Sequence, residues 1–270
     1  MAEGEKEEAT SLQLEFQWVL NEEVPAVFSQ LQRILNECAK QFPVLLSNSE
    51  GQLKQEKYTL TSLTDSIKSN IVLCGDTIIF GEISFKIQRH QYVTYKTAIT
   101  HDNPWKLQQI QDAANHLQQA LRLANSVEKD YNFNSSEEVL HVLGKVLSAL
   151  QRGRTSLIIP RKKTIDDLMK SRNMKLLAPN LPEDLALSFY IQSHKIVLAV
   201  YQIQPSTENN TMTFNTLQAE CSVSWTNEVL VLFTVALQLA QQLKDKISVF
   251  SQYKEFHNEN PAKLNSSDKV

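Results

Sequence analysis

Hydrophobic residues recur at spacings of three and four residues in four stretches of the chain, which predicts four helices. The first stretch runs from residue 11 to residue 42. Pro25 lies inside it, so we expect either a kink or a restart of the helix capped by Asn21. The second stretch begins at residues 102–105, where acidic and amide capping residues precede Pro104 at the first helical position. It should continue to about residue 124.

The third helix should begin at Ser135, because Ser135 and Glu138 have the spacing of a capping box, and it should end at Gly153. The fourth helix is predicted over residues 227–253. Its first half is apolar on nearly all sides, so we expect it to be the central helix. The heptad seam of this helix consists of Val229, Phe233, Ala236, Ala240, Leu243, Ile247 and Phe250.

Between the predicted helices the pattern changes to alternation of apolar and polar residues, which predicts β-strands. These segments are rich in Ile, Val, Thr, Tyr and Phe. Thr164 should cap one short helix that runs to residue 170. The predicted strand segments are 57–63, 71–74, 78–87, 92–99 and a second block over 185–223.

The order of helix, strands, two helices, strands and helix predicts an α+β fold. We expect an antiparallel four-helix bundle with heptad seams, plus a smaller, discontinuous β domain. The bundle domain would combine residues 1–54 with 100–155 and 224–256, and the β domain would combine 55–99 with 156–223. Residues 257–270 are polar and should form a flexible tail.

Composition and charge narrow the range of functions. Hydrophobic residues make up 42% of the chain and charged residues 21%, as in ordinary globular proteins. A net charge of −3 gives no reason to expect a nucleic-acid partner, which usually requires a concentrated basic face. Glycine occurs only 6 times in 270 residues, about a third of its usual share. Phosphate-binding loops use glycine, so a nucleotide-binding enzyme is disfavoured.

Several features indicate a cytosolic protein. The three cysteines are far apart and unpatterned, which favours reduced, buried thiols over disulfides. Residues 1–9 are acidic and lack the apolar core of a signal peptide. The longest uncharged apolar-rich run, 229–243, contains 15 residues including glutamines and is too short for a membrane span.

Candidate catalytic chemistry is weak throughout the sequence. It contains none of the usual phosphate-loop, dinucleotide, nucleophile-elbow or zinc-binding motifs. His116 and His141 could meet between helices, but helix histidines are far more often structural. Cys74 with His90 could form a thiol site, although a buried strand cysteine is the better interpretation. We therefore predict a non-enzymatic protein with no catalytic residues, no cofactor and no metal.

The adjacent carboxylates Asp166 and Asp167 are better explained as helix-capping residues than as a catalytic pair. Neighbouring residues on a helix point about 100° apart, and acidic residues in a first turn interact favourably with the helix dipole.

Two surface features remain as candidates for partner binding. A basic stretch over residues 152–163 could contact an acidic partner or a lipid surface, or could be a solvated loop. Glutamine-rich stretches in the second and fourth helices could form a polar interface with a partner helix, or a solvated helix face, and the sequence favours neither. The candidate partner-binding residues are Gln108, Gln109, Gln111, Gln241, Gln242 and Lys244.

Two strings in the chain resemble the Rogdi family, the atypical leucine-zipper proteins of animals. They are NPWKLQQIQDA at residues 103–113 and LAQQLKDKISVF at residues 239–250. Shorter stretches at 14–18, 181–185 and 199–202 fit as well, and the order of elements matches along most of the chain. The resemblance implies a helical domain and a β domain, and it marks no catalytic residues.

The resemblance also implies a function that no residue pattern shows. Rogdi is similar to the small subunit of the RAVE complex, which acts with a rabconnectin-type WD-repeat protein to promote assembly of the vacuolar H⁺-ATPase (V-ATPase). We therefore expect an adaptor or scaffold subunit that binds this WD-repeat protein and cytosolic-sector subunits of the V-ATPase. It would reach synaptic vesicles or other acidic organelles only through these partners.

The alternative is a nuclear regulatory protein that acts through leucine-zipper dimerisation, since the resemblance implies a nuclear location as well. Because four heptad helices can satisfy one another within one chain, we expect a monomer.

Overall fold

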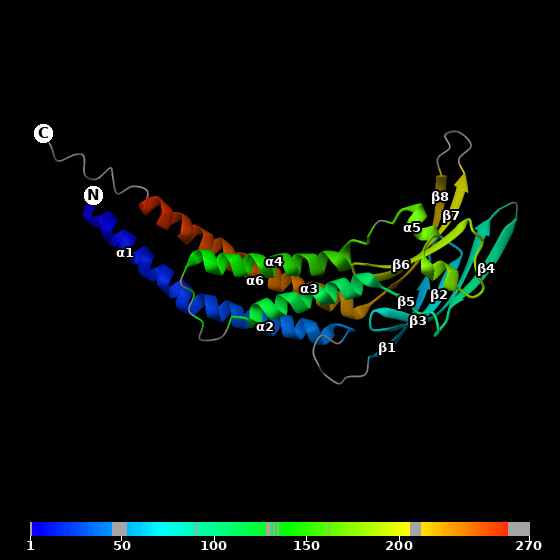
Figure 1. The fold of residues 1–270 in the computed structure, drawn as a ribbon, viewed down its shortest axis with the longest axis horizontal. Helices are drawn as coiled ribbons and strands as arrows, with labels where there is room; N and C mark the ends of the chain where they lie inside the picture. Colours follow the sequence, from blue (N-terminus) through cyan, green and yellow to red (C-terminus); the bar gives the residue numbers. More distant parts are fainter. Residues whose placement is uncertain are drawn as a thin grey trace. The chain divides into compact units, whose positions relative to one another are not determined.

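The computed structural model describes residues 2–44, 53–89, 91–127, 131, 133, 135–161, 163–205 and 212–258 (Figure 1). The chain divides into two compact units. The helical unit comprises Met1–Lys40, His116–Arg152 and Val231–Val270, and the sheet unit comprises Gln41–Asn115 and Gly153–Leu230. The boundary between the units falls within four helices, which are Val24–Gln41, Gln108–Asn125, Ser136–Ile158 and Ser224–Asn258.

A single antiparallel sheet of eight strands forms the sheet unit (Figure 1). Seven strands follow the order β4-β3-β2-β1-β8-β7-β6, and β5 pairs with β3. The predicted strands over 57–99 and the second block over 185–223 therefore join in one sheet, because β1 pairs with β8. The strands are β1 (Gln55–Thr61), β2 (Ile67–Cys74), β3 (Thr77–Gln88), β4 (Tyr92–Ile99), β5 (Trp105–Lys106), β6 (Leu185–Gln192), β7 (Lys195–Pro205) and β8 (Met212–Ser222).

Local sequence explains how neighbouring strands connect and which side chains they bury. Gly75 has a φ of +62° in the turn between β2 and β3, a conformation that glycine adopts without steric cost. On β3, Ile83 and Phe85 are buried while Glu82 is exposed, which is the predicted alternation. The alternating residues therefore place one apolar face of β3 in the core.

Most of the helical segments predicted by the three-to-four periodicity are present, although their ends differ. The helices are α1 (Ala2–Trp18), a π-helical turn (Val19–Glu23), α2 (Val24–Gln41), α3 (Gln108–Asn125), α4 (Ser136–Ile158), α5 (Ile165–Met169), a 3₁₀ turn (Arg172–Leu176) and α6 (Ser224–Asn258). The rest of the predicted tail, residues 259–270, lies outside the described residues.

The interruption predicted near Pro25 takes the form of the π-helical turn. Proline has no N–H and clashes with the carbonyl four residues before it, which here is Asn21. The backbone widens just before the proline, where the N–H of Val24 donates to the carbonyl of Val19, five residues back. Asn21 therefore lies inside the π-helical turn, and a regular helix restarts at Val24.

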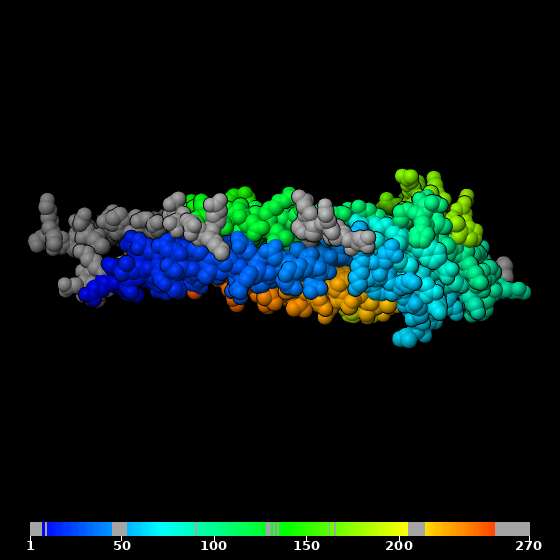
Figure 2. Space-filling view, turned by 90° about the horizontal axis from the view of Figure 1, so that it is seen from below, coloured from blue at the N-terminus to red at the C-terminus, as the bar shows by residue number. Residues whose placement is uncertain are grey.

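In the helical unit, the N-terminal helices lie alongside α6. Figure 2 shows α1 and α2, in blue, running beside α6, in orange. The rings of Phe16 and Phe250 are 5.5 Å apart, and the Lys246 ammonium lies 2.7 Å from the Glu23 carboxylate. The side-chain amide of Gln32 donates to the carbonyl of Ala124 at 2.9 Å, which joins α2 to the end of α3.

The prediction of an antiparallel four-helix bundle with a smaller β domain is wrong, although the chain has both helices and strands. The structure instead combines helices with one curled, eight-stranded antiparallel sheet, and the sheet unit holds the larger part of the chain. The physical reason is that periodicity reveals an apolar stripe but not what covers it. In α3, for example, Ile110 belongs to the sheet unit and Leu117 to the helical unit.

Two predicted helix ends are also wrong. The second helix begins at Gln108 and not at Pro104, because Trp105 is 3% exposed and pairs as β5 with Ile78 of β3. Burial of a large aromatic side chain therefore outweighs a favourable helix-start pattern. The third helix continues past Gly153 to Ile158, since an isolated glycine costs a helix only about 1 kcal/mol.

Candidate partner-binding surfaces and a cleft on the sheet

Gln109, one of the predicted partner-binding residues, lies in the interior of the sheet unit. Its side-chain amide donates to the carbonyls of Ser156 and Ile191, both at 2.9 Å. Its side-chain carbonyl accepts from the N–H of Ile191 at 2.8 Å. With these three hydrogen bonds and only 9% exposure, Gln109 joins α3 to the end of α4 and to β6.

The remaining predicted partner-binding residues lie on two separate units. Gln108 and Gln111 belong to the sheet unit, whereas Gln241, Gln242 and Lys244 belong to the helical unit. The glutamines other than Gln242 form hydrogen bonds along their own helices, from Gln108 to Asp112 at 3.0 Å, Gln111 to Asn115 at 3.0 Å and Gln241 to Asp245 at 2.7 Å. Gln242 is exposed, and Lys244 is half-buried.

The predicted seam of α6 is buried except at its last position. Val229, Phe233, Ala236, Ala240, Leu243 and Ile247 are at most 2% exposed, whereas Phe250 is partly exposed beside Phe16. The opposite side of the same helix is more open. Val231, Val235 and Val249 are exposed there, with Gln238 and Gln242 between them.

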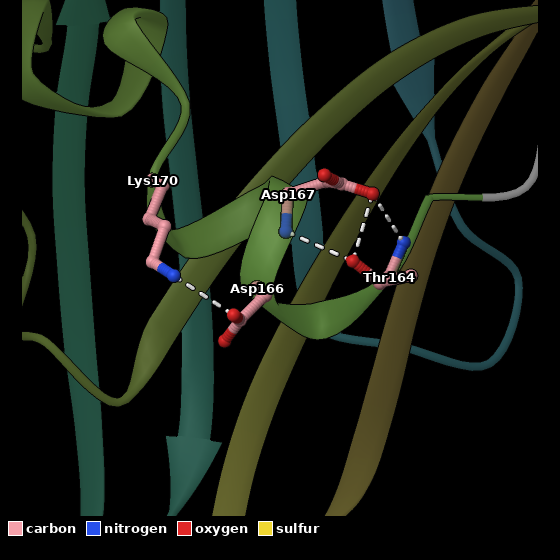
Figure 3. A network of polar contacts seen from close by, with 4 residues as sticks. All are labelled: Thr164, Asp166, Asp167 and Lys170. Carbon is pink, nitrogen blue, oxygen red and sulfur yellow. Dashed lines mark hydrogen bonds and ion pairs between the residues drawn. The ribbon is translucent and has the colours of Figure 1, made fainter.

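The acidic pair Asp166–Asp167 caps and stabilises α5, as predicted (Figure 3). The N–H of Asp167 donates to the Thr164 hydroxyl at 3.1 Å, and the Asp167 carboxylate accepts from the N–H and the hydroxyl of Thr164. These hydrogen bonds lower the pKa of Asp167. Asp166 instead pairs with Lys170 at 2.8 Å. The two carboxylates therefore serve different contacts of one helix.

The described histidines and cysteines are dispersed over several elements. His116 and His141 lie on α3 and α4, and no group of His, Cys, Asp or Glu side chains in the described part of the chain could hold a metal ion. Cys38 is fully buried, and burial raises the pKa of its thiol to about 12. The predicted alternative of Cys74 with His90 cannot be placed, because His90 lies outside the described residues.

The sheet unit contains a cleft of about 560 Å³. One wall comes from β6, β7 and β8, and the other parts come from residues 105–109 and 160–173. Sequence reasoning missed this site because its walls are separated by up to about a hundred residues, and no local pattern indicates that they meet. The wall residues from the strands are Ser188, Phe189, Tyr190, Tyr201, Ile203, Phe214, Thr216 and Gln218.

Aromatic side chains dominate the strand wall of the cleft. The rings of Tyr201 and Phe214 meet edge to face with centroids 5.9 Å apart. Tyr190 accepts a 3.3 Å hydrogen bond at its hydroxyl from the amide of Gln218. Burial raises the pKa of Tyr190 and of Tyr201, so both hydroxyls are neutral at physiological pH. The wall therefore offers ring faces and neutral polar groups.

Cationic side chains lie in the part of the cleft lining that is outside β6, β7 and β8. Lys106, Arg161 and Lys163 line it, and Arg161 pairs with Asp112 while Lys106 lies 3.2 Å from Asp76. The predicted basic stretch thus contributes two residues to the cleft, and its Lys162 lies outside the described residues. Among the described lining residues there is no His, Cys, Asp or Glu. The lining is suited to binding an apolar group that carries negative charge.

To cross a bilayer, a helix needs a longer apolar stretch than any of the described helices provides.

Comparison with known proteins identifies the family. The family model described as Rogdi leucine zipper containing protein matches residues 15–269. The chain belongs to the Rogdi family. It is 56% identical over 256 residues to protein rogdi of Drosophila melanogaster, with 95% of this chain and 94% of the relative covered. The protein rogdi homologs of Danio rerio and Homo sapiens are 39% and 38% identical, and the alignments cover 94% and 91% of this chain and 98% and 94% of those relatives. The resemblance seen in the two sequence strings is therefore confirmed.

Proposed function

We propose that this Rogdi family protein is a non-enzymatic adaptor subunit of a RAVE-like complex. In this role it binds a rabconnectin-type WD-repeat protein and cytosolic-sector subunits of the V-ATPase, and it promotes assembly of the pump. It acts in the cytoplasm and reaches acidic organelles such as synaptic vesicles through these partners.

The cleft of the sheet unit carries the proposal. Its aromatic rings, amides and cations can bind a partner, whereas burial raises the pKa of the Tyr190 and Tyr201 hydroxyl groups, away from the range suited to proton transfer near neutral pH. An adaptor needs partner binding and not proton transfer. The family membership supports the same proposal, because the resemblance to Rogdi implies the pump-assembly role.

Affinity purification tests the proposal. The tagged full chain, expressed in cells that contain acidic organelles, should recover a rabconnectin-type WD-repeat protein together with V-ATPase subunits. A tagged, unrelated protein of similar size serves as the control for nonspecific capture. Recovery of neither partner above that control would refute the proposal.

The alternative function, nuclear regulation through zipper dimerisation, requires an open heptad seam. Six of the seven seam residues of α6 are at most 2% exposed, so that seam is already occupied within the chain. We accordingly propose a monomer. Sedimentation equilibrium over a wide range of concentrations should give a constant monomer mass, and a mass that rises to that of a dimer would favour the alternative.

A further inference from the structure

Strand β6 forms one edge of the sheet, and side chains cover most of that edge. Among the strands that the structure describes, β6 pairs only with β7. On its other side, the N–H of Leu187 lies 3.1 Å from the sulfur of Met174, and the N–H and carbonyl of Ile191 bond to Gln109. Such contacts protect an edge strand from pairing with other chains.

The protection is interrupted at Phe189. Alternate residues of a strand in antiparallel pairing direct their backbone groups to the same side. The N–H and carbonyl of Phe189 therefore point away from β7, as those of Leu187 and Ile191 do. In the part of the chain that the structure describes, neither the N–H nor the carbonyl of Phe189 has a hydrogen-bond partner. Phe189 is only 4% exposed, and it lines the cleft.

Buried backbone groups are nearly always paired, because a buried N–H or carbonyl without a hydrogen-bond partner destabilises the fold. The two groups of Phe189 sit side by side, which matches the donor and acceptor of one residue in a neighbouring strand. We propose that the cleft binds an extended peptide segment of a partner protein, which adds to β6 as a short strand and pairs with the backbone of Phe189.

The lining of the cleft indicates which peptide it would bind. In an added strand, side chains alternate between the two faces of the sheet. The residue next to the one paired with Phe189 would extend toward Tyr190, Tyr201 and Phe214, which favours an apolar or aromatic side chain. Lys163, which also lines the cleft, favours an acidic residue nearby. A volume of about 560 Å³ admits a few residues.

This inference deepens the proposed adaptor function and rests on it for the biological origin of the peptide. The binding chemistry itself can be tested with the isolated full chain. A phage-displayed library of random heptapeptides, panned against the full chain, should enrich acidic peptides that contain an apolar or aromatic residue. A fluorescent copy of the enriched peptide then gives a dissociation constant.

Two variants separate the cleft from the rest of the surface. Phe214→Ala removes an exposed ring from the cleft wall and should weaken binding about tenfold. Tyr92→Ala removes another exposed ring from β4, the opposite edge strand, and should leave binding unchanged. Equal effects of the two variants, or no enrichment of any peptide family, would overturn the proposal.

A scan of N-methylated peptides tests the backbone pairing directly. Methylation of the amide that donates to the Phe189 carbonyl should weaken binding about tenfold, and methylation of its two neighbours should have little effect. If methylation at every position changed the dissociation constant equally little, side chains alone would hold the peptide. That result would overturn the strand addition. If Phe214→Ala abolishes peptide binding but still recovers the pump subunits, the adaptor function stands and its link to the cleft fails.

Discussion

The buried hydrogen bonds of Gln109 provide a sharp test of the structure. Gln109→Leu keeps the approximate volume of the side chain but removes its polar atoms. The N–H and carbonyl of Ile191 would lose their partner, and the bond to the carbonyl of Ser156 would be lost as well. Because both groups of Ile191 would remain in a buried part of the sheet, the free energy of unfolding should fall by about 3 kcal/mol.

Urea unfolding followed by circular dichroism measures this change. Gln108→Leu is the matched control, since Gln108 is the preceding residue, is exposed and donates its side-chain amide to Asp112 of its own helix. The control should alter the free energy of unfolding by less than about 0.5 kcal/mol. Equal urea midpoints of unfolding for the two variants would refute the assignment of Gln109 to the interior and would indicate that it lies on the surface.

Three further predictions concern the helices and a buried thiol. Leu243→Asp places an unpaired charge in a buried position of α6 and should lower the free energy of unfolding by several kcal/mol. The melting temperature of this variant should therefore lie far below that of Gln242→Asp, an exposed control. Equal melting temperatures would contradict the burial of the seam. Thr164→Ala removes the cap of α5 and should cost about 1 kcal/mol locally, detected as faster hydrogen exchange in α5 alone. Cys38 should resist thiol reagents at pH 8 until the chain unfolds, while the two half-buried cysteines react first.

Cys38 also makes stability depend on pH. Its pKa of about 12 in the folded protein lies above the ordinary thiol value of about 8.5 expected after unfolding. Between these values the unfolded chain binds fewer protons than the folded one, so the free energy of unfolding should fall as pH rises above about 8.5. Cys38→Ala, compared with the wild type at several pH values, should remove this part of the pH dependence.

Local patterns predicted secondary structure well where burial agrees with them. The alternation on β3 and the cap at Thr164 depend on neighbouring residues alone, and both were correctly predicted. The predicted helix start at Pro104 failed because Trp105 pairs with a strand almost thirty residues earlier. A long-range contact of this kind leaves no mark in the local pattern.

The fold class and the cleft could not be predicted for the same reason. An apolar stripe on α3 has the same sequence pattern whether it meets helices or a sheet. Gln109 looks like any surface glutamine until Ile191 is placed beside it. The cleft requires Phe189, Phe214 and Arg161 to come together, and only the pairing of the strands and the path of the connecting segment achieve this.

The most direct test of the adaptor function is the extent of V-ATPase assembly in cells that lack this protein. Membranes are isolated, and the ratio of cytosolic-sector to membrane-sector subunits is measured by quantitative immunoblotting. The proposed function predicts a lowered ratio that the wild-type chain restores, with total subunit levels unchanged. A ratio equal to that of normal cells would contradict a role in pump assembly.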